Sequence, residues 1–271
     1  MERIILIETS TALCSVALAE DGAIVSYRES SAPKAHASLT AVFIQEMLSE
    51  RGLALADCDA VCVSMGPGSY TGLRVGVSTA KGLCFGSGKP LLAVGTLDTL
   101  VAQAAAACYP DAAACHPDAP ACHPDAPACH PERSEGSFHC PPSGNYRYII
   151  PMIDARRMEV YTALFEADEA DAKESLRYRQ ITETAPAIID ENSFSEYLEQ
   201  GPCLFIGDGA GKCADVIRHP NATFCQCWPK ASSMLEPAVA AFRAGNFQDV
   251  AYFEPFYLKE FVATVSKKKL W

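Results

Sequence analysis

The chain has 271 residues, of which 49% are hydrophobic and 20% charged, so it carries enough apolar side chains to bury a core. Its net charge of -11 excludes a protein that grips nucleic acid with its whole surface, because phosphate contacts need a basic footprint. The first residues lack the features of a signal peptide and no stretch reaches the roughly 18 to 20 apolar residues that span a bilayer, so we expect a cytoplasmic protein without membrane contact.

Residues 1–107 predict three strands followed by alternating helices and strands. Short apolar runs bounded by turn residues indicate the strands, and Asp21-Gly22 supplies the tight turn of a hairpin. Apolar residues at helical spacing indicate the helices, of which the last is capped by Thr96. In chain order, the predicted elements are strands 4–7, 14–19 and 23–28, helix 36–50, strand 60–65, helix 71–85, strand 91–94 and helix 97–107.

Residues 108–144 form a segment with a seven-residue period, in which Cys108, Cys115, Cys122 and Cys129 recur in register. Proline in nearly every repeat excludes a helical heptad, and the composition predicts a disordered or extended insertion. Adjacent Cys-His pairs leave a zinc-binding protein as an alternative. Structural zinc sites usually take their ligands from spaced pairs such as C-x2-C, so we predict no metal site.

Residues 145–271 repeat the order of elements seen in the first part of the chain. The predicted elements are strands 148–153, 160–166 and 176–181, helix 194–199, strand 203–206, helix 212–218, strand 223–227 and helix 233–244. Both halves therefore predict the strand-strand-strand-helix-strand-helix order of a ribonuclease-H-like unit. Two such units, 1–107 and 145–271, predict a duplicated α/β protein of the actin/sugar-kinase/Hsp70 (ASKHA) architecture, with the insertion 108–144 between them.

In nucleotide-hydrolysing proteins of that architecture, the turn after the first strand of each half meets the phosphates and typically carries an Asp with a nearby Gly. The corresponding turns here carry Glu8 and Thr9 in the first half and Asp154 in the second, but no glycine. A structural hairpin is therefore favoured over independent ATP turnover. A third turn, with Gly207 and Gly209, follows a strand and opens a helix, so it fits an anion or adenosine site and a tight connection equally well.

The loop Gly66–Gly72 also lies between a predicted strand and helix. It lacks the Gly-Lys-Ser/Thr of a Walker A loop, and its spacing differs from the Rossmann fingerprint. On the helix that follows, Gly72, Gly76 and Ala80 recur every four residues, and small residues in such a row let another backbone come close. An apolar stripe on the same helix already serves its own sheet, so we interpret the small-residue row as a protein-contact surface. Ordinary packing within the chain is the alternative.

No set of residues with catalytic spacing stands out. The folded halves contain no H-x-x-x-H or H-E-x-x-H pair for a metal and no G-x-S-x-G elbow for a nucleophile. We therefore predict no catalytic residues.

Five motifs, taken together and in order, resemble the bacterial TsaB family of tRNA threonylcarbamoyladenosine biosynthesis proteins, which older naming calls glycoprotease-like. The glycine loop is the most specific of them, and the resemblance covers both halves but omits 108–144. The motifs are Ile4–Ser10, Gly66–Gly76, Met152–Tyr161, Gly207–Ala210 and Glu254–Leu258.

This resemblance implies an actin-like fold with degenerate nucleotide sites and no chemistry of its own. It implies pairing with the catalytic paralogue TsaD, together with the ATPase TsaE, in the complex that transfers a threonylcarbamoyl group to the adenosine next to the anticodon of tRNAs. ATP and metal are then expected on the partner subunits, and tRNA is met only through the complex. A stand-alone actin-fold ATPase or kinase remains the alternative.

The resemblance also implies that helices 36–50 and 71–85 form the dimer surface, either with TsaD or with a second copy of the chain. The expected interface residues are Leu39, Phe43, Tyr70, Gly72, Arg74, Gly76 and Ala80.

Overall fold

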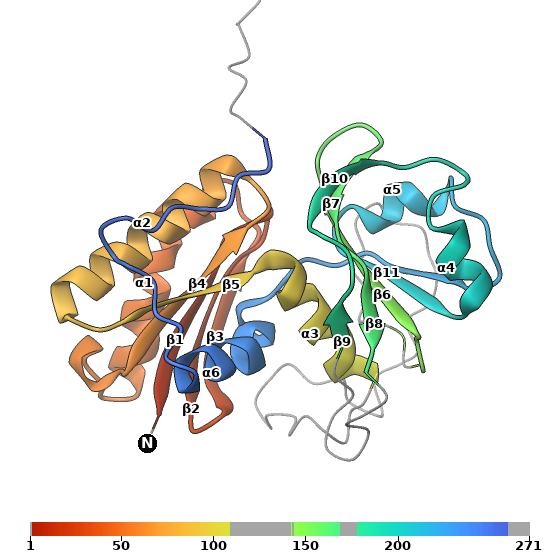
Figure 1. The fold of residues 1–271 in the computed structure, drawn as a ribbon. Helices are drawn as coiled ribbons and strands as arrows, with labels where there is room; N and C mark the ends of the chain where they lie inside the picture. Colours follow the sequence, from red (N-terminus) through yellow and green to blue (C-terminus); the bar gives the residue numbers. More distant parts are fainter. Residues whose placement is uncertain (1, 109–141, 143, 169–177, 260–271) are drawn as a thin grey trace, which may run out of the picture.

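The computed structural model describes residues 2–108, 142, 144–168 and 178–259. Two α/β lobes lie side by side, each built on one β-sheet (Figure 1). Apart from Cys108, Pro142 and Gly144, the predicted insertion 108–144 lies outside the described residues, and so do the Cys-His pairs within it.

The first lobe contains a five-stranded sheet with the order β3-β2-β1-β4-β5. The first three strands are antiparallel, whereas β4 and β5 run parallel to β1. The predicted strands and helices of residues 1–107 are confirmed, with boundaries within two residues of those observed. The elements are β1 (Arg3–Glu8), β2 (Cys14–Glu20), β3 (Ala23–Ser30), α1 (Ala35–Glu50), η1 (Leu55–Asp57), β4 (Ala60–Gly66), α2 (Tyr70–Ser87), β5 (Leu91–Gly95) and α3 (Thr96–Cys108).

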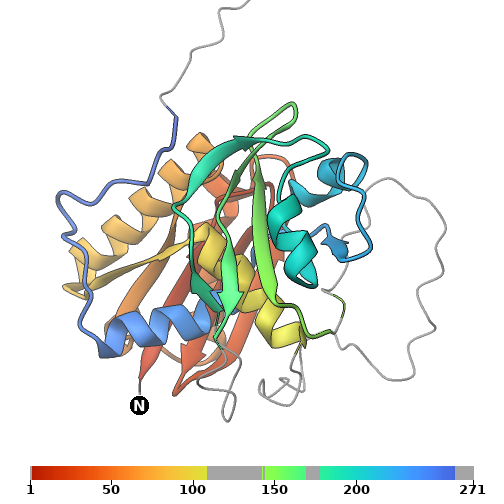
Figure 2. The same ribbon diagram turned by 45° about the vertical axis from the view of Figure 1, so that its right-hand side comes forward.

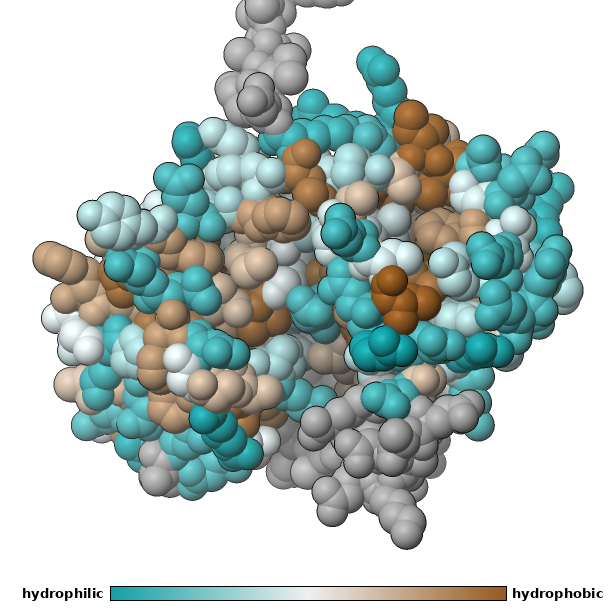
Figure 3. Space-filling model, in the orientation of Figure 1, coloured by the Kyte–Doolittle hydropathy of each residue, from teal (hydrophilic) through white to brown (hydrophobic). Residues whose placement is uncertain are grey.

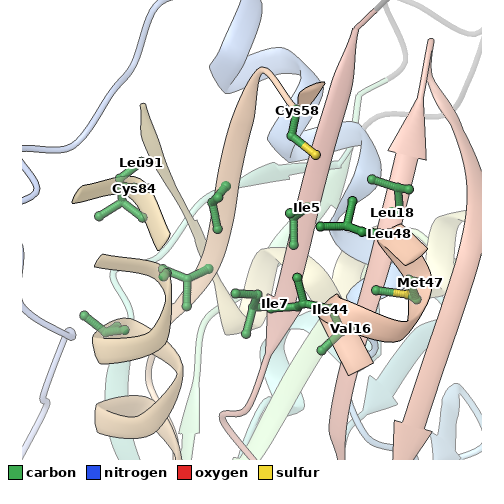
Figure 4. Close-up of a cluster of buried hydrophobic side chains, with 14 residues drawn as sticks. Ile5, Ile7, Val16, Leu18, Ile44, Met47, Leu48, Cys58, Cys84 and Leu91 are labelled. Carbon is green, nitrogen blue, oxygen red and sulfur yellow. The ribbon is translucent and has the colours of Figure 1, made fainter. Parts of the chain in front are cut away.

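Both faces of the first sheet are covered because successive side chains of β1 point to opposite sides. Ile5 and Ile7 belong to a core formed with α1 and α2, in which Ile44 lies beside them (Figure 4). Ile4 and Leu6 belong to a separate core on the other face. A continuous apolar run is what a strand buried on both faces requires.

The second lobe repeats the same strand order, β10-β7-β6-β11-β12, with β8 and β9 attached beside β6. The recurrence of this order confirms the predicted duplicated α/β architecture. The elements are β6 (Tyr148–Asp154), β7 (Glu159–Thr162), β8 (Phe165–Ala167), β9 (Tyr178–Gln180), β10 (Ala185–Ile188), α4 (Ser195–Gln200), β11 (Cys203–Ile206), α5 (Ala210–Ala214), β12 (Ala222–Cys225), η3 (Ala231–Met234) and α6 (Leu235–Arg243).

Three predictions for the second lobe are wrong in detail. The strand predicted over 160–166 is two strands, β7 and β8, which pair with different partners. The third place in the sheet belongs to β10 and not to the strand predicted over 176–181, whose described part, β9, pairs with β8. Sequence patterning missed β10 because it is short and contains Pro186, which a sheet tolerates only at an edge. The helix predicted over 212–218 is observed as α5, which begins and ends earlier.

Each lobe is covered in part by a helix from the other part of the chain. Although α3 follows β5, its Leu97 and Leu100 pack in a core with Ile149 of β6 and Leu204 of β11. In the opposite direction, α6 and η3 pack on the face of the first sheet that lies opposite α1 and α2, and Figure 1 shows α6 against that lobe. The packing units therefore do not coincide with a division of the chain into 1–107 and 145–271, which stays a prediction.

The segment after α6 runs back beside α2, as Figure 2 shows. Lys81 of α2 holds it by donating from Nζ to the carbonyl oxygens of Ala251 at 3.1 Å and Phe253 at 2.9 Å. Further along, the Phe256 amide donates to the Met65 carbonyl oxygen at 2.7 Å. The segment thus connects α2 to the loop that follows β4.

Candidate functional site

The loop Gly66–Gly72 lies directly on the turn that follows β1. The Ser69 amide donates to the Ser10 carbonyl oxygen at 2.6 Å, and the Thr9 hydroxyl donates to the Gly72 carbonyl oxygen at 2.9 Å. A Cβ atom added at Gly68 would lie 2.3 Å from the Ser10 carbonyl oxygen, which is too close for any side chain. Glycine in this loop therefore serves close packing of two backbones.

The interpretation of Gly72, Gly76 and Ala80 as a partner-facing row is wrong. All three are buried. A Cβ at Gly72 would lie 2.0 Å from the Thr9 carbonyl oxygen, and a Cβ at Gly76 would lie 2.2 Å from the Thr9 Oγ1. The small residues let α2 approach the turn after β1 of its own lobe. Ordinary packing within the chain, the alternative weighed above, is what the structure shows.

The first predicted phosphate turn is closed by this packing. Glu8 and Thr9 have no exposed surface, and the Ser10 amide already donates to the Glu8 Oε1 at 2.6 Å. Burial raises the pKa of the Glu8 carboxyl to about 7, although hydrogen bonds from Ser10, Ser64 and Thr9 oppose the rise. The expectation that Glu8 and Thr9 contact a nucleotide is therefore wrong in this structure, because their own loop covers them.

The turn with Gly207 and Gly209 connects β11 to α5, and its amides are used within the chain. Gly207 donates to the Cys225 carbonyl oxygen at 3.1 Å, and Gly209 donates to the Met152 carbonyl oxygen at 3.0 Å. Gly207 has φ +132°, and a Cβ there would lie 2.2 Å from the Met152 carbonyl oxygen. These contacts favour the tight connection over an anion site, since an anion needs free amides.

Asp154, at the end of β6, is exposed but already has partners. Its carboxylate forms an ion pair with Lys212 and accepts a hydrogen bond from the Arg156 amide at 2.9 Å. Its own amide donates to the Asp208 Oδ1 at 2.9 Å, and burial raises the pKa of that carboxyl to about 6. Each of the five predicted nucleotide residues thus makes contacts within the chain, and a role for Asp154 in nucleotide binding stays a prediction.

The remaining predicted interface residues lie on or beside the helix pair. Leu39 and Phe43 of α1 are half-buried, and Phe43 packs against the core beneath it. The Tyr70 ring lies 4.8 Å from the Tyr257 ring, and the exposed Arg74 lies 4.5 Å from the Tyr70 ring centre. Tyr257 therefore joins Tyr70 and Arg74 in one cluster at the start of α2.

The side of α1 and α2 that points away from the sheet forms what we call the outer face. It includes two exposed large apolar side chains, Val42 at 41% and Phe85 at 87% of full exposure. A second row of small residues on α2, spaced by four, is exposed here, and a Cβ at Gly82 or Gly86 would meet nothing within 4 Å. Figure 3 shows hydrophobic and polar residues interspersed over this half of the molecule. The outer face consists of Ala41, Val42, Gln45, Ser78, Gly82, Phe85 and Gly86.

Sequence reasoning missed this outer row, although its signal was present. Ser78, Gly82 and Gly86 have the same four-residue spacing as Gly72, Gly76 and Ala80. Spacing along a helix identifies a row but does not say which row faces the sheet.

A pocket of about 420 Å³ lies between the lobes, where the loop after β4 meets α3 and the segment 180–184. Its walls carry the carboxyl groups of Asp98 and Glu183 beside Gly66, Pro67 and Phe256. Burial raises the pKa of Asp98. Two carboxyl groups make these walls unsuited to a polyphosphate, because like charges repel.

Among the residues that the structure describes, no group of three or more His, Cys, Asp or Glu side chains is arranged to hold a metal ion. No helix within the same residues is long and apolar enough to cross a membrane.

Comparison with known proteins identifies relatives over nearly the whole chain. The TsaB protein of Haemophilus influenzae, a tRNA threonylcarbamoyladenosine biosynthesis protein, is 40% identical over 269 residues, covering 98% of this chain and 96% of that protein. The TsaB protein of Escherichia coli is 29% identical, covering 96% of both.

Two further comparisons bear on the fold and on a part of the chain. A solved structure from Pseudomonas aeruginosa, described as an uncharacterized protein with similarity to peptidase YeaZ, has a TM-score of 0.71 at 24% identity and covers 96% of this chain and 100% of that one. A family model described as TsaD, tRNA N6-adenosine threonylcarbamoyltransferase, matches residues 29–119. With 40% identity to a curated relative along almost its full length, the chain belongs to the TsaB family of tRNA threonylcarbamoyladenosine biosynthesis proteins.

Proposed function

We propose that the chain is a non-catalytic partner subunit of the complex that installs threonylcarbamoyl on the adenosine next to the anticodon of tRNAs. The observation that carries this proposal is the closure of the first phosphate turn. Glu8 and Thr9 lie fully buried beneath the loop Gly66–Gly72, where a phosphate-binding turn would have to be open. Since the amides of Gly207 and Gly209 are also engaged, the alternative of a stand-alone ATPase or kinase is not favoured.

The partner we propose is a TsaD-type transferase docked on the outer face. The matched transferase region, residues 29–119, contains both α1 and α2. A protein that shares this helix pair can present the same surface in return, so that the two meet about an approximate two-fold axis. The open positions at Gly82 and Gly86 allow close approach of a facing helix, and Phe85 and Val42 supply apolar contact at its edges.

The same geometry accommodates a second copy of this chain when the transferase is absent. A TsaE-type ATPase would complete the complex, with ATP and metal held by the partner subunits.

The test mixes the chain with a TsaD-type transferase and a TsaE-type ATPase, and measures co-elution and the yield of threonylcarbamoyladenosine in tRNA. Phe85→Asp combined with Val42→Asp should weaken co-elution at least about tenfold, because charges replace exposed apolar anchors. Ile188→Asp is the matched control, since Ile188 is 77% exposed on the other lobe. Full modification without the chain, or equal co-elution of the outer-face variant and the control, would contradict the proposal.

A further inference from the structure

The hairpin between β6 and β7 holds two consecutive arginines in an unusual backbone conformation. Arg156 has φ +72° and Arg157 has φ +52°, both in the left-handed region. The Ala155 amide donates to the Glu159 carbonyl oxygen at 3.0 Å, and the Glu159 amide donates to the Arg156 carbonyl oxygen at 3.1 Å, which closes the turn. Gly, Asn or Asp is usual at such positions, because a longer side chain crowds the backbone there.

No contact within the described part of the chain offsets this crowding. Both arginines are exposed, and neither guanidinium has a hydrogen-bond or ion-pair partner there. Residues kept in a disfavoured conformation without an internal contact commonly serve a function outside the chain.

Two of the three neighbouring carboxylates are paired with lysines. Asp154 pairs with Lys212, and Glu159 pairs with Lys259 from the segment beside α2. The Asp208 carboxylate accepts from the Asp154 amide and lies close to Lys212. The three carboxylates have only two lysines between them. With Arg156 and Arg157 added, four positive charges face three negative ones, so the hairpin keeps a local excess of one positive charge although the chain as a whole carries a net charge of -11.

The hairpin is also placed where a large ligand can reach it. Figure 1 shows the loop that joins β6 to β7 projecting beyond the end of the second sheet. Two guanidinium groups on a projecting hairpin have the charge that backbone phosphates attract, and arginine donates paired hydrogen bonds to phosphate oxygens.

We propose that Arg156 and Arg157 bind backbone phosphates of the RNA on which the complex acts. This inference rests on the proposed function, which supplies RNA as the substrate of the assembled complex. It assigns the otherwise acidic chain a local RNA contact of its own, one that positions the substrate without reading its sequence.

The test measures binding of an unmodified tRNA transcript to the complex assembled from the chain and a TsaD-type transferase, at several salt concentrations. Arg156→Gly combined with Arg157→Gly removes both charges and also the backbone crowding. The fold should therefore become more stable while RNA binding weakens, and the slope of log affinity against log salt should fall by about one for each lost phosphate contact. Arg179→Gln combined with Arg218→Gln, two exposed arginines of the same lobe, removes the same charge elsewhere and should leave the slope almost unchanged.

The outcomes separate this inference from the proposed function. If the wild-type chain assembles with the transferase but the glycine variant keeps the wild-type salt slope, the RNA contact is overturned and the partner role stands. Loss of assembly in the glycine variant alone would show that the arginines contact protein carboxylates and would also overturn it. Failure of the wild-type chain to assemble would overturn both.

Discussion

Replacing Glu8 with Gln should make the fold more stable, and the gain should grow with pH. Glu8 lies with no exposed surface at the end of β1, and its Oε2 has no hydrogen-bond partner among the described residues. Burial disfavours the charged carboxylate, so the pKa is raised from 4.5 to about 7. Glutamine has nearly the same shape but no charge to bury.

The sign and size of this pH-dependent stability gain follow from the linkage between proton binding and folding. Because the folded pKa is raised above the unfolded one, the contribution of Glu8 to stability is fully present below about pH 4.5 and is lost as the pH rises through about 7. At about 1.4 kcal/mol per pH unit between the two pKa values, the full loss is about 3 kcal/mol. The stability difference between Glu8→Gln and wild type should therefore be about 1 kcal/mol near pH 5 and about 3 kcal/mol near pH 8.

Urea unfolding of both proteins at several pH values between 5 and 8 measures this difference. Glu46→Gln, at an exposed position of α1, removes a carboxylate without relieving burial and should change the stability little at any of them. A stability difference between Glu8→Gln and wild type that is the same at pH 5 and pH 8 would refute the reasoning.

Two further predictions concern the close packing around the glycines. Gly76→Ala should destabilise the fold by about 1 to 3 kcal/mol, because its Cβ would lie 2.2 Å from the Thr9 Oγ1. Gly82→Ala on the same helix should stabilise the fold by up to about 1 kcal/mol. Equal effects of the two substitutions in denaturant unfolding would contradict the assignment of Gly76 to the buried side of the helix. Gly207→Ala should destabilise by more than about 2 kcal/mol, because φ is +132° and the Met152 carbonyl oxygen is 2.2 Å from the new Cβ, and a wild-type unfolding midpoint would argue against the tight connection.

Much of the fold could be predicted because its signals are local. Buried strands such as β1 and β4 are short apolar runs with turn residues at both ends, and the repeated order of elements identifies the duplication. The second lobe was harder to predict because β10 is short and contains a proline. Its place in the sheet is set by pairing with β7 and not by its own pattern.

The candidate site was predicted less well, and α2 shows why. The helix carries two rows of small residues with identical spacing, one through Gly76 and one through Gly82. Only the first row was singled out from the sequence, and its spacing could not say whether it faces the interior or the solvent. That is decided by a contact with Thr9, whose hydroxyl bonds to a residue 63 positions further along the chain.

The sequence by itself therefore determined the elements of the first lobe, the duplicated architecture and the family motifs, because each depends on neighbouring residues or on their order. Only the tertiary structure decided that Glu8 is buried, that Gly82 and Phe85 face outward, and that α3 and α6 pack on each other's lobe. These features depend on contacts between distant segments, and the periodicity of a single segment carries no information about its distant neighbours.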